Sequence, residues 1–187
     1  MRLFVALEIP EEVRRELAAF IERVRTVARG SRWVRAEGLH VTLKFIGEMA
    51  SEKVPDLQKE LAQVHLSAAV DVRIRGGGFF PNERHPRIFW IGVEASQNLA
   101  ELAAAVDANT KKLGVAPENR AYSPHVTLAR FKSDDGLPQL RDAIRGLGPL
   151  EFGEMRATEF QLIRSELQPG GSRYTRLASF SFSGKES

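Results

Sequence analysis

A strand-and-helix pattern that occurs twice constrains the fold of this chain more than any other feature. The tetrapeptide His-Val-Thr-Leu occurs at residues 40–43 and again at 125–128, an offset of 85 residues. A short apolar segment precedes each copy, and residues 5–8 match residues 91–94 in pattern at an offset of 86. Nearly equal offsets indicate a duplicated unit of strand, helix, loop and motif strand.

The segment after each apolar strand has the spacing of an amphipathic helix. The apolar positions Val13, Leu17, Phe20 and Val24 correspond, at an offset of 86, to Leu99, Ala103, Val106 and Thr110. In a duplicated unit, a pseudo-twofold axis relates the two motif strands. We therefore expect the two motifs to lie on opposite walls of one cleft.

Apart from the repeat, helical spacing, caps and alternation predict several further elements. They are a helix that begins at Ser51, strands at 70–75 and 88–93, a helix over 138–147, and two strands around a turn at 168–172. The run Gly76-Gly77-Gly78 is interpreted as a flexible or bulged connection. It is not a phosphate-binding loop, because no Gly-Lys-Ser/Thr follows it.

Composition excludes several classes of protein. The chain of 187 residues has no cysteine, which excludes a disulfide framework, a thiolate zinc site and a cysteine nucleophile. No apolar run approaches transmembrane length, and Glu8 follows the N-terminus too soon for a signal peptide. We therefore expect a cytoplasmic protein that is not associated with a membrane. The net charge of +3 permits an anionic partner without specifying one.

Each motif carries the groups needed for paired acid and base catalysis. In a strand, residues i and i+2 point to the same face, so each copy presents its His and Thr together. Imidazole has an unperturbed pKa near ~6.5, so one copy can be neutral while the other is charged. Threonine adds a hydroxyl donor for a phosphate oxygen. Two protonation roles and two neutral donors suit a phosphodiester, and a cyclic phosphodiester especially.

A basic residue follows each motif, but the alternation of side chains along a strand places the two on different faces. Strict alternation places Lys44 on the same face as His40 and Thr42, where its charge would neutralise a phosphate. In the second copy, alternation places Ala129 on that face and Arg130 on the other. Arg130 reaches the site only if the strand ends or bulges there.

A metal site is the main alternative role for the two motif histidines. Zinc usually needs three or four ligands, and no further His or Cys lies near either motif in the sequence. His65 and His85 have no counterpart in the other half, so we expect both at the surface. We expect neither a metal nor another cofactor.

The sequence around both motifs resembles a known family. Residues 32–35 and 39–48 resemble the first motif region of the bacterial 2′-5′ RNA ligase-like proteins, and residues 122–130 resemble the second. These proteins are RNA 2′,3′-cyclic phosphodiesterases of the 2H phosphoesterase superfamily. The resemblance implies a single α+β domain over residues 1–187, with two pseudo-symmetric lobes. Two antiparallel sheets would line a central cleft, with helices outside.

The resemblance also implies a reaction and a role for each site residue. The reaction is metal-independent hydrolysis of a terminal RNA 2′,3′-cyclic phosphate to a 2′-phosphate. His40 would be the proton donor and His125 the proton acceptor, whereas Thr42, Thr127 and Arg130 would bind the phosphate. The family also has a reversible ligase activity that joins tRNA halves through a 2′-5′ bond.

The motifs leave other functions open. One alternative is a non-catalytic module that binds RNA ends, and another is a phosphodiesterase for small cyclic nucleotides or an ADP-ribose cyclic phosphate. The expected partner is an RNA end that carries a 2′,3′-cyclic phosphate, such as that of a tRNA half. No protein partner is expected, and a monomer is the default.

Overall fold

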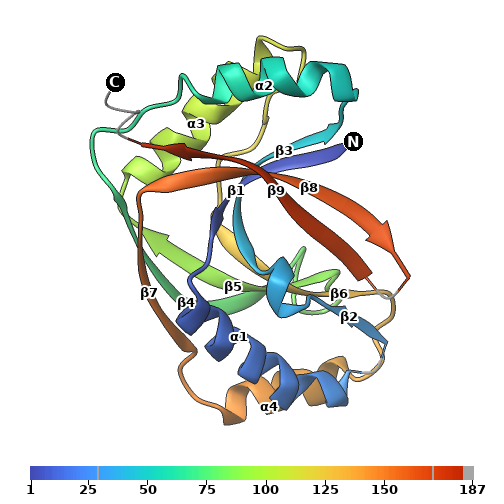
Figure 1. The fold of residues 1–187 in the computed structure, drawn as a ribbon. Coiled ribbons are helices and arrows are strands. Elements are labelled where there is room, and N and C mark those ends of the chain that lie inside the picture. The colour runs from blue at the N-terminus through green and yellow to red at the C-terminus, as the bar shows by residue number, and fades with distance from the viewer. Residues whose placement is uncertain (29, 170, 183–187) are drawn as a thin grey trace.

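The computed structural model describes residues 1–28, 30–169 and 171–182, which form two antiparallel sheets with helices outside them (Figure 1). The first sheet, in the order β3-β1-β8-β9, contains β3 (His40–Glu48), β1 (Arg2–Glu8), β8 (Glu159–Gln168) and β9 (Gly171–Ser181). The second sheet, in the order β2-β6-β5-β4-β7, contains β2 (Ser31–Trp33), β6 (His125–Phe131), β5 (Ile88–Ala95), β4 (Val70–Phe80) and β7 (Glu151–Ala157). This arrangement confirms the predicted α+β fold class.

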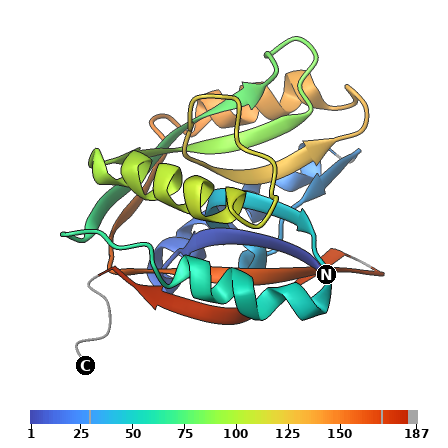
Figure 2. The same ribbon diagram turned by 90° about the horizontal axis from the view of Figure 1, so that it is seen from above.

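Four α-helices of the described residues cover the outer sides of the sheets. They are α1 (Glu11–Val24), α2 (Val54–Leu61), α3 (Asn98–Lys111) and α4 (Leu137–Gly146). α1 contacts α4 and β7, whereas α3 contacts α2 and β3. In Figure 1, α2 and α3 therefore lie at one end of the molecule and α1 and α4 at the other. Figure 2 views the molecule from the end where α2 and α3 lie, and α3 is seen there beside β3.

The helix that follows the first strand of each half covers the sheet of the other half. β1 belongs to the first sheet, yet α1 packs against β7 of the second sheet. β5 belongs to the second sheet, yet α3 packs against β3 of the first sheet. Each lobe is therefore built from both halves of the chain.

Burial confirms the helical part of the repeat. All eight corresponding positions are buried, namely Val13, Leu17, Phe20, Val24, Leu99, Ala103, Val106 and Thr110. The same spacing therefore turns one apolar stripe of each helix towards a sheet.

The strand part of the repeat differs from the prediction by two residues. Leu7 pairs with Val41 of the first motif, and Ile91 pairs with Val126 of the second motif. The two strands therefore correspond at an offset of 84 residues rather than 86. A shift of two residues leaves every side chain on the same face, so the apolar pattern does not reveal it.

The first motif strand contains a β-bulge. On β3, Thr42 pairs with Ala6 and Lys44 pairs with Val5, so Leu43 is the extra residue. Such a residue inverts the alternation of the side chains that follow it.

The second motif strand contains a bulge at the corresponding place. On β6, Thr127 pairs with Trp90 and Ala129 pairs with Phe89, so Leu128 is the extra residue. The repeat therefore extends to an irregularity of the backbone.

The two bulges decide which side chains share a face with the motifs. Lys44 and Ala129, directly after the bulges, are buried, whereas Phe45 and Arg130 are exposed. Phe45 and Arg130 thereby share the face of the His and Thr of their own motif. The prediction that Lys44 lies on the face of His40 is wrong for this reason.

The three glycines at 76–78 lie inside β4 and not in a connection. A register shift separates Ile74 from Gly77, so the expectation of a bulge is confirmed and that of a flexible connection is not. A Cβ atom on Gly78 would lie 2.5 Å from Cζ2 of Trp90. Glycine at this position therefore makes room for a tryptophan beside the second motif strand.

The remaining predicted elements are found close to their expected bounds. The helix expected from Ser51 is a 3-10 turn that leads into α2, and α4 lies within one residue of 138–147. The C-terminal strands are β8 and β9, joined through the turn expected at 168–172, of which residue 170 lies outside the described residues. None of the described helices has the length and apolar character needed to span a membrane.

Candidate active site

The first wall of the site is the inner face of the first sheet, where His40 and Thr42 on β3 are half-buried. The His40 ring stacks on Phe4 of β1, with 4.5 Å between the ring centroids, and lies edge-on to Tyr174 of β9 at 5.7 Å. Phe4 and Tyr174 pack in a small apolar cluster that is separate from the main core. Two aromatic side chains therefore hold the His40 ring in place.

Burial keeps His40 neutral in the free protein. Desolvation of the ring lowers its pKa to about 4, and the nearby His125 adds to the decrease. A hydrogen bond to the backbone carbonyl of Gly38 acts in the opposite direction. The effect of His125 also means that the two imidazoles lie close enough to disfavour a second positive charge.

The second wall is the inner face of the second sheet, where His125 and Thr127 on β6 are half-buried. Trp90 of β5 lies beside His125, with 6.5 Å between the ring centroids. Nδ1 of His125 lies 2.8 Å from the carbonyl oxygen of Ser123. Because a carbonyl oxygen only accepts hydrogen bonds, Nδ1 carries a proton, which leaves Nε2 of the neutral ring as a proton acceptor.

Both halves of the chain hold their histidine in the same way. His40 bonds to the carbonyl of Gly38, and His125 bonds to the carbonyl of Ser123, in each case two residues earlier. One ring nitrogen of each histidine is thereby committed to the backbone, and the other is left for a ligand.

Tyr122 joins the two walls. Its phenol donates a hydrogen bond to the carbonyl oxygen of Thr42 at 2.9 Å. Burial raises the pKa of the Tyr122 phenol, so the hydroxyl keeps its proton and remains a donor. Because Tyr122 lies three residues before His125, this bond sets the loop of the second motif directly against the first motif.

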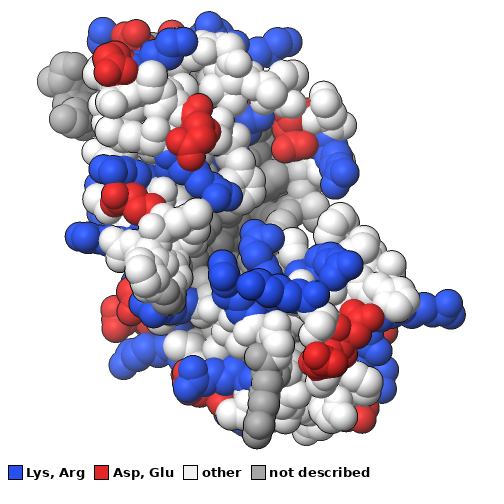
Figure 3. All heavy atoms as spheres, turned by 90° about the vertical axis from the view of Figure 1, so that its right-hand side faces the viewer, with Lys and Arg blue, Asp and Glu red and all other residues white. Residues whose placement is uncertain are grey.

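The structure thus brings His40, Thr42, His125 and Thr127 onto two walls that meet where β3 contacts β6. Arg130 lies on the same face as Thr127 because of the bulge. Figure 3 shows a hollow between the two halves of the molecule, with Lys and Arg side chains gathered along one side of it. Positive charge at the edge of a hollow favours an anionic ligand.

Lys44 does not belong to this group. Its ammonium lies 2.5 Å from Oδ1 of Asp107 on α3 and 2.7 Å from the carbonyl oxygen of Ala116. The same carboxylate oxygen accepts the backbone N–H of Glu118 at 3.0 Å. Burial acts to raise the pKa of Asp107, but the bonds from Lys44 and Glu118 outweigh it and lower that pKa. Lys44 therefore anchors the segment after α3 to β3.

The other two histidines are at the surface, as predicted. His65 is exposed, and so is His85, whose Nδ1 lies 2.9 Å from Oδ2 of Asp134. Among the residues that the structure describes, no group of three or more His, Cys, Asp or Glu side chains could hold a metal ion.

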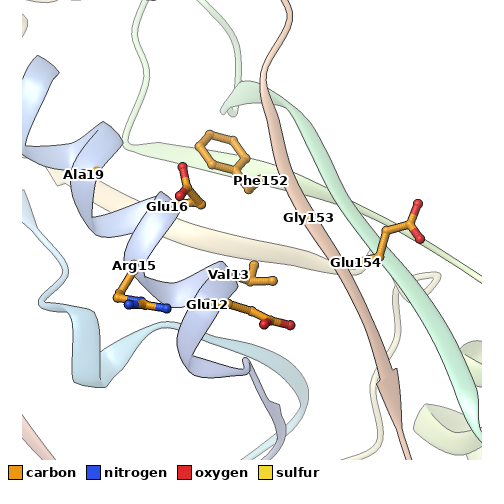
Figure 4. Close-up of a pocket in the computed structure, with 8 residues that line it drawn as sticks. All are labelled: Glu12, Val13, Arg15, Glu16, Ala19, Phe152, Gly153 and Glu154. Carbon is orange, nitrogen blue, oxygen red and sulfur yellow. The ribbon is translucent and has the colours of Figure 1, made fainter.

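A separate groove lies between α1 and β7, on the outer side of the second sheet (Figure 4). Its volume is about 520 Å³, and its lining residues are Glu12, Val13, Arg15, Glu16, Ala19, Phe152, Gly153 and Glu154. None of these residues belongs to either motif, so the groove is distinct from the candidate active site.

The sequence pattern does not assign a site role to four aromatic neighbours of the motifs, which are Phe4, Trp90, Tyr122 and Tyr174. Phe4 and Trp90 lie on the strands that pair with the motif strands, so the repeat could have indicated that they lie near the motifs. Tyr122 and Tyr174 come from a loop and from the last strand, and no local pattern indicates their contacts.

Two facing sheets that each carry a His-x-Thr motif define this protein as a 2H phosphoesterase by its fold. The chain belongs to the 2′-5′ RNA ligase superfamily, whose family model matches residues 13–169. The resemblance found around the two motifs is therefore confirmed over most of the chain.

Relatives and solved structures match nearly the full length. The RNA 2′,3′-cyclic phosphodiesterase of Methanocaldococcus jannaschii is 37% identical over 175 residues, which are 93% of this chain and 96% of the relative. The crystal structure of TT0787 of Thermus thermophilus has a TM-score of 0.82 and 36% identity, with 100% of both chains covered. E. coli LigT complexed with 3′-AMP has a TM-score of 0.79 and 26% identity, covering 96% of this chain and 97% of LigT.

Proposed function

We propose that this protein is an RNA 2′,3′-cyclic phosphodiesterase that opens a terminal cyclic phosphate to a 2′-phosphate. One observation carries the proposal. Two His-x-Thr pairs come from different sheets, and each imidazole is held by the carbonyl two residues before it. The names of the Methanocaldococcus relative and of the LigT complex with 3′-AMP support a substrate with a ribose phosphate.

In the proposed step, Nε2 of His125 accepts a proton from water while the water oxygen bonds to phosphorus. The bond between phosphorus and O3′ breaks on the opposite side, and His40 donates its proton to O3′. The phosphate remains on O2′. One proton leaves the water and one reaches the ribose oxygen, so the histidine pair ends with its protons exchanged and solvent restores them. The step uses no metal or cofactor.

Three further residues bind the phosphate in this proposal. The hydroxyls of Thr42 and Thr127 donate hydrogen bonds to its non-bridging oxygens, and the guanidinium of Arg130 stabilises the charge that develops on them. Lys44 is left out, because its ammonium is already bound to Asp107.

The donor role of His40 depends on the substrate. His40 must be protonated to act as a donor, whereas burial holds its pKa at about 4 in the free protein. An anionic phosphodiester between the two rings favours the charged imidazole and so raises this pKa. Substrate binding thereby converts the resting pair into an acid and a base.

The same acid and base also support ligation. If the 5′-hydroxyl of a second RNA attacks in place of water, the product is a 2′-5′ bond, and the reverse reaction uses the same two histidines. The description of the superfamily as 2′-5′ RNA ligases supports ligation as part of the proposal. The RNA ends that we propose for it are those of tRNA halves. Joining of two synthetic tRNA halves by the purified protein tests it.

The central test is turnover of an RNA oligomer with a terminal 2′,3′-cyclic phosphate. His40→Ala and His125→Ala should each lower kcat by roughly 10²–10⁴-fold, because each variant removes one proton transfer. His65→Ala removes an exposed imidazole outside the motifs and is the matched control, with full activity expected.

Three results would contradict the proposal in different ways. Full activity of either motif variant would refute the paired mechanism. A wild-type protein that binds the RNA end without turnover would be the non-catalytic module instead. A rate that falls with excess chelator and returns with added metal would refute the metal-free step.

A further inference from the structure

Arg32 and Arg130 lie directly opposite each other in the antiparallel ladder of β2 and β6. Residues that face each other across such a ladder project from the same side of the sheet. On β5, the partners of Thr127 and Arg130 are Trp90 and Ile88, which are two residues apart and so share a side. Arg32, Arg130 and Thr127 therefore all lie on the cleft side of the second sheet.

The packing of Trp33, the next residue, also indicates that Arg32 points to the cleft side of the sheet. Trp33 packs against the core residue Phe89, with 6.4 Å between the ring centroids. Adjacent residues of a strand point to opposite sides, so Arg32 points away from the core. Its side chain is exposed.

Two arginines in this arrangement are unfavourable without an anion. Like charges directly opposite each other destabilise an antiparallel pair. Within residues 1–28, 30–169 and 171–182, no carboxylate forms an ion pair with Arg32 or Arg130. Elsewhere in the same sheet, by contrast, Arg73 lies opposite Glu154 and forms an ion pair with it. The uncompensated pair at the cleft therefore indicates a site for more than one phosphate.

We propose that Arg32 binds the phosphodiester one nucleotide upstream of the cyclic phosphate. The inference rests on the proposed function, in which Arg130 contacts the terminal phosphate. β2 is the edge strand of the second sheet, next to β6, and neighbouring strands are about 5 Å apart. Arg32 therefore contacts the RNA further from the motifs than Arg130 does. The site then favours RNA oligomers over mononucleoside cyclic phosphates, which have no second phosphate to bind.

Arg32→Ala tests the inference on two substrates, a dinucleotide with a terminal 2′,3′-cyclic phosphate and a mononucleoside 2′,3′-cyclic phosphate. The variant should raise KM for the dinucleotide roughly tenfold with kcat unchanged, because a charged contact is lost in ground state and transition state alike. KM for the mononucleoside should not change. The dependence of log(kcat/KM) on log[salt] for the dinucleotide should become shallower by about 0.7.

Two further variants complete the experiment. Arg32→Lys keeps the charge and should keep most of the salt dependence. Arg23→Ala removes an exposed arginine from α1 and is the control, with no change on either substrate.

An equal loss on both substrates would overturn the inference, because Arg32 would then act at the terminal phosphate. An unchanged KM for the dinucleotide would overturn it as well. A wild-type protein that opens neither substrate would refute the proposed function and the inference together. If the wild-type protein opens both substrates, the proposed function stands, and a negative result with Arg32→Ala then refutes the inference alone.

Discussion

At the scale of single residues, two copies of one tetrapeptide place their histidines in different surroundings. His40 stacks on Phe4 at 4.5 Å, whereas His125 lies beside Trp90 at 6.5 Å and at a steep angle to it. These neighbours come from the adjacent strands, where the two halves of the chain differ in sequence. Equal motifs therefore do not give equal environments, which allows the two imidazoles to take different roles.

The pKa of His40 is the residue property that the proposed mechanism depends on most. In an NMR titration, His40 should titrate near pH 4 in the free protein. Binding of a nucleoside 2′-phosphate should raise that pKa, because the added negative charge favours the imidazolium. A pKa that stays near 4 in the complex would contradict the role of His40 as the proton donor.

The same pKa fixes the sign of a stability effect. Its value in the folded protein, about 4, lies below the ordinary value of 6.5, so between these pH values the unfolded chain binds a proton that the folded protein does not. The contribution of His40 to stability is therefore present above pH 6.5 and is lost as the pH falls towards 4. His40→Gln in the free protein should reduce this loss in chemical denaturation, and an identical pH dependence would contradict the assigned pKa.

At the scale of elements, one extra residue in each motif strand decides which side chains reach the cleft. Alternation predicts Lys44 on the site face and leaves Arg130 off it, and the bulges at Leu43 and Leu128 reverse both placements. Neither leucine carries a local sign of a bulge, because the irregularity is created by pairing with β1 and β5. Strand periodicity predicts the faces of His and Thr, which precede the bulge, and fails only beyond it.

The position of Lys44 makes a prediction that separates anchoring from phosphate binding. Lys44→Met keeps the length of the side chain but removes the donor to Asp107 and Ala116. The free energy of unfolding should fall by about 1–3 kcal/mol, towards the lower end because Asp107 is 24% exposed and solvent screens it. Denaturant unfolding and kcat/KM of the folded variant measure the two effects, and kcat/KM should stay within a few-fold of wild type.

The opposite result for Lys44→Met would be equally informative. A large loss of activity with unchanged stability would show that Lys44 binds the phosphate, and it would contradict the pairing with Asp107. Arg130→Ala is the matched comparison, since it removes an exposed cation after the second bulge and should lower activity without lowering stability.

At the scale of the whole molecule, the site depends on the exchange of helices between the lobes. α1 follows β1 yet covers the second sheet, and α3 follows β5 yet covers the first. Neither half of the chain therefore supplies a complete lobe, and the bond from Tyr122 to Thr42 adds a direct connection between the walls. The relative placement of the two motifs is a property of the complete fold.

The sequence predicts the features that follow a local period, but not the contacts between distant segments of the chain. Helix positions such as Val13 and Leu99 follow a local period, so their burial is predictable. The exchange of helices, the strand offset of 84 residues and the contact of Tyr174 with His40 depend on residues that are distant in sequence. No periodic pattern encodes such contacts, so only the structure reveals them.

The position of the phosphate in the product tests most directly whether the two motifs act on opposite sides of the scissile bond. The purified protein is incubated with an RNA oligomer that ends in a 2′,3′-cyclic phosphate, and the product is analysed by phosphorus NMR. We predict a 2′-phosphate alone, because in the proposed step His40 protonates O3′ while water attacks from the side of His125. A 3′-phosphate, or a mixture of the two, would contradict the account.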